Sequence, residues 1–467
     1  MKIKFIGAAR EVTGSKHLIT TNLGKKILLD CGMFQGKGLA TDGMNRDLMF
    51  DPSEIDHIIL THAHIDHSGL IPYMYKLGFR GSVVCTSATR DLCAIMLTDS
   101  AFIQEHDTFT FNKRRAKKGL PLVTPLYTQA DATAVMGLFI GVPNGMKFRI
   151  DDNIKVTFTS TGHMLGSGVA NLQILENGQI TRIAYTGDIG RPVDPILSNP
   201  VPFPQADILI TESTYGDRLH EDIKRAEDEL LKVVVDTCVN KGGKLIIPAF
   251  SVGRTQEIVY AFNNFFNKGV LPRVDVFVDS PLAVNATTVF RMHPECFNKS
   301  FADVLEKDPD PFGFDNLFYI TKVEDSKRLN DHKKPCIIIS ASGMMEAGRV
   351  KHHLANNISD PRNTVLIVGY CAPTTLGARI GRGDKEVSIH GTVYEVKAEV
   401  KKIESFSGHG DYKEMIGFLA CQDKSAIAKT FIVHGEYETQ KKYVASLQNE
   451  GYKNIEIPAK GQEYEML

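Results

Sequence analysis

The chain has 467 residues, of which 43% are hydrophobic and 23% are charged, and this balance excludes a disordered or low-complexity protein. Its length corresponds to about three average domains. The formal net charge is −1, which excludes a protein that attracts nucleic acid or membranes through an overall positive field.

The cysteines and the apolar runs indicate where the protein acts. The eight cysteines include no CxxC pair, so we expect reduced thiols rather than a disulfide framework or a thiolate zinc site. The opening stretch MKIKFIGAAREVTG is too interrupted for a signal peptide, and no apolar run approaches the roughly 18 residues of a membrane span. We therefore expect a cytoplasmic protein with no membrane partner.

Short β-branched runs separated by turn residues fill roughly the first 200 positions. The predicted strands are KIKFIG, HLITT, KKILLD, DHIILT, GSVVCT, IKVTFTS, NLQILE and TRIAYT. Helical spacing of apolar residues appears at 70–77 and 91–105. Strands and helices together predict a layered α/β domain rather than a pure sandwich.

From about residue 207 the pattern changes to strands that are each followed by a helix. The strands are DILITES, KLIIPAF, DVFVDS, CIIISAS and TVLIVGY, and crossover helices between them predict a parallel sheet. After about residue 375 short strands return. If the two outer parts share one core, the middle part is an insertion, and the predicted domains are 1–208 and 379–467 around an inserted 209–378.

The strongest local signal is HAHIDH, residues 62–67, directly after the predicted strand DHIILT. Residues two apart point the same way in extended geometry, so His62 and His64 can hold one cation while Asp66 and His67 face a second. Imidazole and carboxylate ligands without thiolates suit zinc, with manganese or iron left open. His163 also follows a predicted strand.

Asp188, in TGDIG, likewise follows a predicted strand. HxHxDH followed by an isolated histidine and then an aspartate, in this order, resembles the metallo-β-lactamase superfamily. That resemblance implies an αββα sandwich and ligands around two metal ions: His62, His64 and His163 around one, Asp66 and His67 around the other, and Asp188 between them. Asp30, in the strand before HAHIDH, resembles a carboxylate that orients a ligand histidine.

Three further segments narrow the family. LITES ends in Glu212, SFSGHGDY carries His409, and FIVHGE carries His434. They resemble the additional motifs of the β-CASP subgroup, in which a nucleic-acid-clamping domain is inserted into the metallo-β-lactamase domain. The resemblance covers essentially the whole chain and implies an α/β protein, an αββα sandwich with an inserted parallel-sheet β-CASP domain. It adds His434 to the metal ligands and implies two zinc ions.

A histidine in the last motif is the residue that RNA-acting members of the subgroup carry. Ile65 makes HAHIDHSG similar to the cleavage-and-polyadenylation endonuclease and its prokaryotic relatives rather than to RNase J. The predicted activity is therefore zinc-dependent endonucleolytic hydrolysis of single-stranded RNA by a two-metal mechanism with a bridging hydroxide. The candidate catalytic residues are Asp66 and His409, the latter as a general acid held by Glu212.

Several residues are candidates for phosphate contacts. Ser407 and Gly408 precede His409 and can donate hydrogen bonds, while segments that resemble β-CASP sequence contain the others, which are Arg254, Ser342 and Arg379. The basic run KRRAKKG, residues 113–119, is expected in a surface loop, where it can touch an RNA backbone; a solvated helix end is the alternative.

Other functions compete with this interpretation. The metal motif alone also fits a small-molecule metallo-hydrolase, and a catalytically inactive scaffold would be expected to lack some of the ligands. A DNA nuclease of the same subgroup is the nearest alternative. The sequence leaves open the RNA target, the bound metal, and whether the chain is a monomer or a homodimer.

Overall fold

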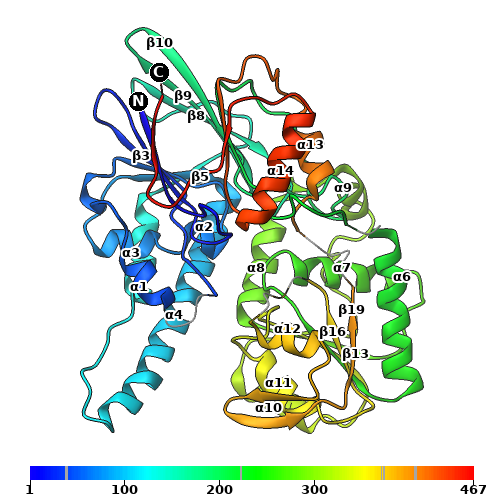
Figure 1. Cartoon of the computed structure of the whole chain (residues 1–467). Helices are drawn as coiled ribbons and strands as arrows, with labels where there is room; N and C mark the ends of the chain where they lie inside the picture. The colour runs from blue at the N-terminus through cyan, green and yellow to red at the C-terminus, as the bar shows by residue number, and fades with distance from the viewer. Residues whose placement is uncertain (37–39, 221–222, 370, 372–373, 404–407, 467) are drawn as a thin grey trace. The chain divides into compact units, whose positions relative to one another are not determined.

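The computed structural model describes residues 1–36, 40–220, 223–369, 371, 374–403 and 408–466. The chain divides into two compact units (Figure 1). The first contains Met1–Asp194, Ser198–Leu219 and His409–Leu467, and the second contains Pro195–Leu197 and His220–Gly408. No helix in the described part of the chain is both long and apolar enough to cross a membrane.

Two seven-stranded sheets form the centre of the first unit. One has the order β22-β1-β2-β3-β4-β5-β6, and its strands are β1 (Lys2–Gly7), β2 (Lys16–Thr20), β3 (Lys26–Leu29), β4 (His57–Ile59), β5 (Ser82–Thr86), β6 (Phe139–Val142) and β22 (Glu463–Glu465). The other has the order β21-β20-β11-β10-β9-β8-β7, and its strands are β7 (Phe148–Arg149), β8 (Ile154–Ser160), β9 (Gly168–Glu176), β10 (Gln179–Tyr185), β11 (Ile208–Thr211), β20 (Lys429–Ile432) and β21 (Ile455–Glu456).

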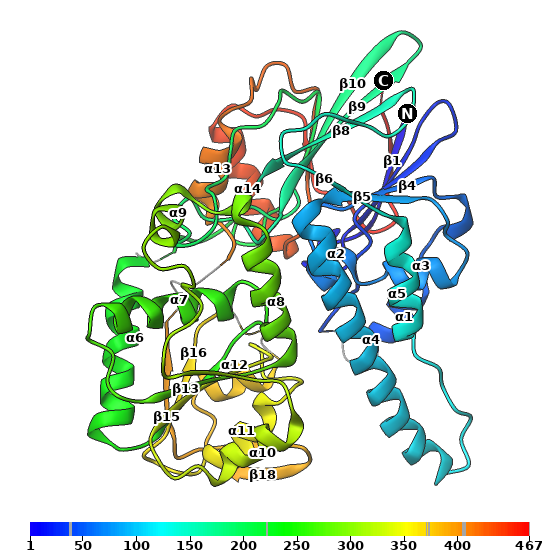
Figure 2. The same ribbon diagram turned by 180° about the vertical axis from the view of Figure 1, so that it is seen from behind.

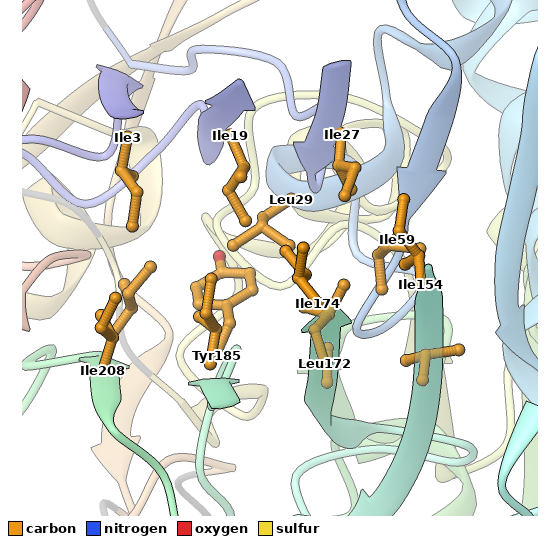
Figure 3. Close-up of a cluster of buried hydrophobic side chains, with 14 of the residues drawn as sticks. Ile3, Ile19, Ile27, Leu29, Ile59, Ile154, Leu172, Ile174, Tyr185 and Ile208 are labelled. Carbon is orange, nitrogen blue, oxygen red and sulfur yellow. The ribbon is translucent and has the colours of Figure 1, made fainter. Parts of the chain in front are cut away.

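Alternating apolar side chains of the two sheets face one another and make one core (Figure 3). Ile27 and Leu29 lie two residues apart on β3, and Leu172 and Ile174 lie two apart on β9. Because side chains alternate along a strand, this spacing turns both members of each pair inward, and all four are buried. The strand runs predicted from the sequence therefore supply the inner faces of a sandwich.

Helices cover the outer faces of both sheets. They are α1 (Ala40–Arg46), α2 (Ile65–Ser68), α3 (Ile71–Lys76), α4 (Ser87–Ala116), α5 (Gln129–Val135), α13 (Tyr412–Leu419) and α14 (Tyr437–Asn449). α4 contacts β5 and β6, whereas buried residues of α13 and α14, such as Met415 and Leu447, pack against the second sheet. The layers are therefore helix, sheet, sheet and helix, which confirms the predicted αββα fold class.

The second unit contains a six-stranded sheet of order β14-β13-β15-β12-β16-β19, in which every pairing is parallel as predicted. Its strands are β12 (Lys244–Pro248), β13 (Asp275–Asp279), β14 (Leu317–Ile320), β15 (Cys336–Ser340), β16 (Thr364–Ile367) and β19 (Glu399–Lys402), with a hairpin of β17 (Glu386–Ile389) and β18 (Thr392–Glu395). Its helices are α6 (Ile223–Val234), α7 (Arg254–Asn267), α8 (Pro281–Met292), α9 (Lys299–Leu305), α10 (Val323–Asp331), α11 (Val350–Asn357) and α12 (Leu376–Gly381).

Two features differ from the sequence-based expectations. The helix expected at 91–105 is much longer, because α4 begins after Thr86, whose side chain accepts a hydrogen bond from the Thr89 amide, and continues through residue 116. Residues 113–116 are thus the largely exposed end of a helix, which is the alternative given above for this run, and the expected loop is wrong for these residues. β19 pairs with β16 and so belongs to the second unit, although the expected segment 379–467 grouped it with the outer domain. The predicted domain limits themselves stay a prediction.

Candidate metal centre

Parallel strands deliver the candidate residues to one edge of each sheet. β10, β11 and β20 run parallel, with Tyr185 opposite Ile210 and Ile210 opposite Phe431. Their carboxyl ends lead directly into the segments that carry the functional side chains Asp188, Glu212 and His434. In the first sheet, β3 and β4 are also parallel and lead into Asp30 and the run 62–67. Long-range strand pairing therefore assembles the site.

The backbone at this edge is unusually constrained. Asp30 and His434 both have left-handed φ values, 56° and 51°, which non-glycine residues rarely adopt. Such conformations persist where the surroundings fix them, often at functional sites. Gly190 passes so close to the neighbouring loop that a Cβ atom there would lie 2.4 Å from the His163 nitrogen. Glycine is therefore required to bring the loop after Asp188 against the loop that carries His163.

One cluster combines three histidines with one carboxylate: His62, His64, His163 and Asp188. Asp188 Oδ2 lies 3.5 Å from His62 Nε2 and 3.5 Å from His163 Nε2. His163 Nε2 lies 3.1 Å from His64 Nδ1. The Nε2 atom of His62 is buried and has no hydrogen-bond partner among the described residues, so a buried lone pair points into this cluster.

A second cluster lies on the other side of the same carboxylate. It consists of Asp66, His67 and His434. His67 Nε2 lies 3.1 Å from His434 Nε2 and 3.3 Å from Asp188 Oδ1. His434 Nε2 lies 3.4 Å from Asp66 Oδ2. The two oxygens of Asp188 thus face different clusters, and Asp188 is the residue that joins them.

Neighbouring polar groups hold these ligand-type side chains in place. Asp30 is fully buried, and its Oδ2 lies 2.7 Å from His67 Nδ1. The same carboxylate accepts hydrogen bonds from the backbone N–H and the hydroxyl of Thr61. A carboxylate that binds one imidazole nitrogen fixes the ring and directs the other nitrogen at a metal. Asp30 thus occupies the position expected of an orienting group.

Burial also sets the charge of the three histidines in the first cluster. It is the main cause that lowers the pKa of His62 and His163, and it lowers that of His64 to about 3. These rings are therefore neutral at physiological pH. Neutral imidazole is the form that offers a lone pair to a metal ion. The cluster thus has the charge state that metal binding requires.

His409 lies beside the clusters. Its Nδ1 is 3.3 Å from Glu212 Oε1 and 3.9 Å from Asp188 Oδ2, and its side chain is 22% exposed. Burial lowers the pKa of His409, but the carboxylates of Glu212 and Asp188 outweigh it and raise the pKa to about 9. Glu212 is itself held by hydrogen bonds from the backbone N–H groups of Ile189 and Thr214. His409 is therefore protonated at neutral pH and partly accessible to solvent.

The predicted phosphate contacts are placed differently. Gly408 is half-buried next to His409, whereas Ser407 lies outside the described residues. The remaining three belong to the second unit and are not part of the clusters described above: Arg254, Ser342 and Arg379. Arg254 forms an ion pair with Glu257, and Arg379 lies 3.1 Å from Asp384. Their role in RNA binding stays a prediction.

The structure adds residues that the sequence did not single out. The Thr214 hydroxyl lies 2.9 Å from His434 Nδ1, and the Thr61 hydroxyl lies 3.1 Å from His62 Nδ1. Each threonine is within two residues of a predicted site residue, at the end of a strand. That position is the only sequence signal of their role, because a threonine after a strand is common in turns.

Comparisons with known proteins identify the family of the chain. Residues 12–249 match the family model of the metallo-beta-lactamase superfamily, residues 255–380 match the Beta-Casp domain, and residues 393–458 match the Zn-dependent metallo-hydrolase RNA specificity domain. The chain therefore belongs to the metallo-β-lactamase superfamily and carries a β-CASP domain, which confirms the predicted family.

Three relatives extend the match along most of the chain. The chain is 33% identical over 438 residues to Ribonuclease TTHA0252 of Thermus thermophilus, which covers 94% of each chain. It is 32% identical over 461 residues to an RNase J-like protein of Methanocaldococcus jannaschii, covering 98% of this chain and 96% of the relative. Transcription termination factor FttA of the same organism is 32% identical over 448 residues, covering 93% of this chain and 67% of the relative.

Proposed function

We propose that the chain is a zinc-dependent endoribonuclease that hydrolyses internal phosphodiester bonds of single-stranded RNA with two metal ions. The observation that carries the proposal is the position of Asp188. One of its oxygens lies 3.5 Å from His62 and His163, and the other lies 3.3 Å from His67. A carboxylate shared by two clusters of ligand-type side chains is an arrangement that can hold a pair of catalytic metal ions.

The class of enzyme is confirmed as a metal-dependent ribonuclease by the family models and by relatives named as ribonuclease and RNase J-like protein. Endonucleolytic cutting and the two-ion mechanism are the further content of the proposal. The proposal of RNA rather than DNA as substrate is supported by the family model of the Zn-dependent metallo-hydrolase RNA specificity domain. That model matches the segment that contains His409 and His434.

The donor set fits zinc. It combines imidazole and carboxylate groups that are largely buried, and the described residues offer no hydrogen-bond partner to His62 Nε2 or Asp188 Oδ1. We propose that one ion is held by His62, His64 and His163, the other by Asp66, His67 and His434, with Asp188 shared. Bound zinc would make hydroxide available near neutral pH and offset charge on the phosphate; manganese or iron would suit the same ligands.

The protein itself would supply the proton for the leaving oxygen. His409 is partly exposed, and its Nδ1 lies closer to Glu212 (3.3 Å) than to Asp188 (3.9 Å), so it can reach a substrate phosphate while Glu212 fixes its orientation. We propose His409 as the general acid and Glu212 as the group that positions it. Asp66 is the ligand carboxylate with the more exposed side chain, 19% against 2% for Asp188, and we propose that it also contacts the attacking water.

The second unit would bind the RNA strand. Its candidate phosphate contacts are Arg254, Ser342 and Arg379, together with Ser407 and Gly408 just before His409. All eight cysteines are free thiols, which supports a cytoplasmic location. A homodimer is compatible with this function but is not needed for it, because one chain can supply all seven proposed metal ligands.

Cleavage of matched RNA and DNA strands tests the proposal. Single-stranded RNA and DNA of the same sequence, labelled at either end, are incubated with the metal-loaded protein. We expect internal cuts in RNA, no comparable cutting of DNA, loss of activity with a chelator and recovery on addition of zinc. Release of terminal nucleotides only would contradict endonucleolytic action, and equal cutting of DNA would favour the DNA nuclease alternative.

A further inference from the structure

We propose that the outer part of α4 and the segment that returns from it, residues 102–124, form a second binding surface for single-stranded RNA. We call these residues the α4 arm. The inference rests on the proposed function, because it takes RNA to be the polymer that the enzyme handles. It adds a site on the first unit, apart from the ligand clusters, that no family model or motif assigns.

The α4 arm extends away from the core. Figure 2 shows α4 continuing well beyond α3 and α5. Ala101 is the last buried residue of the helix, and Leu126 is the next buried residue along the chain; all positions between them are described, and none is buried. A helix that projects into solvent is expected to be polar. This one instead exposes three phenylalanines, Phe102, Phe109 and Phe111, at 56%, 60% and 47%.

Positive charge gathers on the same arm. Five of the six residues from 113 to 118 are lysine or arginine, and residues 108–124 contain no aspartate or glutamate. The chain as a whole has a net charge of −1, so this cluster is a local feature. It provides the positive surface that a phosphate backbone needs, which the overall charge does not.

The aromatic rings and the cations are interleaved. Lys113 Nζ lies 4.3 Å from the centre of the Phe109 ring, and the Arg115 guanidinium lies 5.5 Å from that of Phe111. Each pair is separated by four residues, or about 6 Å along a helix. A base stacked on either ring would therefore place its phosphate within reach of a cation. Stacking platforms next to positive charge are how proteins bind single strands without sequence preference.

Hydrogen bonds hold the α4 arm in a defined conformation. The Asn112 amide donates to the Val123 carbonyl at 2.8 Å and accepts from the Val123 N–H at 3.0 Å, so the returning segment is fastened to the helix. Arg115 donates to the Pro121 carbonyl, and Arg46 donates to the Thr124 carbonyl at 2.8 Å. A surface that is already ordered loses less conformational entropy when a flexible strand binds.

The arrangement favours RNA over a lipid surface or a second copy of the chain. Phe109 and Phe111 are two residues apart, so they lie on nearly opposite sides of the helix and do not make the single apolar face that inserts into a membrane. Self-association through the arm would bring two groups of five like charges together. A single RNA strand can instead contact both kinds of side chain, with bases on the phenylalanine rings and phosphates beside the lysine and arginine side chains.

Binding measurements on the full chain test the arm. One variant replaces three exposed lysines of the arm (Lys113→Gln, Lys117→Gln and Lys118→Gln), and a matched control replaces three exposed lysines elsewhere on the first unit (Lys147→Gln, Lys155→Gln and Lys453→Gln). Binding of fluorescent oligouridylate is followed by anisotropy in a chelator, where metal-dependent cleavage stops. We expect at least about tenfold weaker binding for the arm variant and a salt slope reduced by about 2, against little change for the control.

Aromatic contacts are tested separately. Phe109→Ala should weaken binding by about tenfold without changing the salt slope, and Phe109→Tyr, which keeps the ring, should restore it. In cleavage assays these variants should raise KM and leave kcat unchanged, since the arm is not part of the metal centre. Circular dichroism and unfolding temperature check that the variants are folded.

The outcomes separate this inference from the proposed function. If the wild type does not cut RNA but arm variants lose RNA binding, the proposed function fails and the arm stands. If the wild type cuts RNA while arm and control variants bind it equally, the arm proposal is overturned. Unchanged RNA binding with an altered oligomeric state, or with loss of binding to phosphatidylserine vesicles, would assign the surface to self-association or to membranes and also overturn it.

Discussion

Two buried aspartates, one in each unit, differ in what surrounds their carboxylates. Asp279 of the second unit accepts hydrogen bonds on both oxygens: Oδ1 lies 2.6 Å from an Arg349 nitrogen, and Oδ2 lies 2.6 Å from His353 Nε2 and 2.5 Å from the Ser326 hydroxyl. Asp188 of the first unit is equally buried, but its Oδ1 has no hydrogen-bond partner among the described residues.

The difference distinguishes a structural charge, Asp279, from the proposed metal ligand, Asp188. Arginine stays protonated, so Arg349 neutralises Asp279 at any physiological pH. Every ion-pair partner of Asp188 in the described part of the chain is a histidine. Burial lowers the pKa of His62 and His163, whereas for His67 and His409 burial is outweighed by nearby carboxylates, Asp188 among them, which raise the pKa. Positive charge beside Asp188 therefore depends on protonation of these rings, unlike the permanent charge of Arg349. A buried carboxylate without a permanent cation is costly unless a metal ion supplies the charge.

The largest expected effect comes from removing the shared carboxylate. Asp188→Asn should release at least one metal ion and reduce RNA cleavage by about a thousandfold or more, because several kcal/mol of charge stabilisation disappears. Elemental analysis of the purified variant and single-turnover cleavage check both parts. Asp279→Asn is the matched control, since it removes one buried charge from the other unit; it should keep the metal content of the wild type. Equal metal loss in both variants would contradict the proposal that Asp188 is a metal ligand and Asp279 is not.

A catalytic group that is not a ligand should behave differently from Asp188. His409→Ala should retain both metal ions and bind RNA, but cut it at least about a hundredfold more slowly, as expected when a positioned general acid is lost. Glu212→Gln should show a milder defect, because it misorients the imidazole without deleting it. Metal content and kcat are measured together. If His409→Ala loses an ion while His434→Ala keeps both, the two roles are reversed.

The local part of the site was predictable from the sequence, and the remote part was predictable only as candidates. Residues 62–67 are contiguous, so the sequence alone shows that four ligand-type side chains lie close together. Glu212 and His434 come together because β11 and β20 pair in parallel across more than 200 residues, a contact that composition and periodicity do not encode. For these two, the family resemblance supplied the expectation.

Pairing and packing explain what the sequence did not show. The α4 arm has weak helical periodicity because it contacts no core, so only the run up to residue 105 was predicted as helix. His353 is buried, and its partner Asp279 lies 74 positions away in the sequence, so no local pattern indicates this pair. Thr214 and Thr61 each contact a histidine through the hydroxyl group. No sequence pattern distinguishes such a threonine from any other.

An orienting carboxylate should have an intermediate effect between a ligand and a structural charge. Asp30→Asn keeps the shape of the side chain but weakens its hold on His67 Nδ1, which lies 2.7 Å away. Outer partners of this kind typically contribute about 10- to 100-fold in metal affinity. We therefore expect the variant to lose metal to a competing chelator at lower chelator concentration than the wild type, while still reaching full occupancy in excess zinc. An unchanged chelator titration would contradict the orienting role.

The smallest expected effect is the pH dependence of stability at Asp279. Burial raises the pKa of this carboxyl, but the hydrogen bonds from His353, Ser326 and Arg349 outweigh it and lower the pKa below its usual value of 3.8. A folded-state pKa below the unfolded one means that the stabilisation is fully present above about pH 4 and is lost as the pH falls through the folded value. Asp279→Asn should therefore lower the free energy of unfolding by about 1.5 kcal/mol at neutral pH, and the difference from the wild type should shrink in more acidic solution.

Because the chain has no tryptophan, urea unfolding is followed by circular dichroism. A difference that stays constant from neutral pH to pH values well below 4 would show that the carboxylate charge is not what stabilises this cluster.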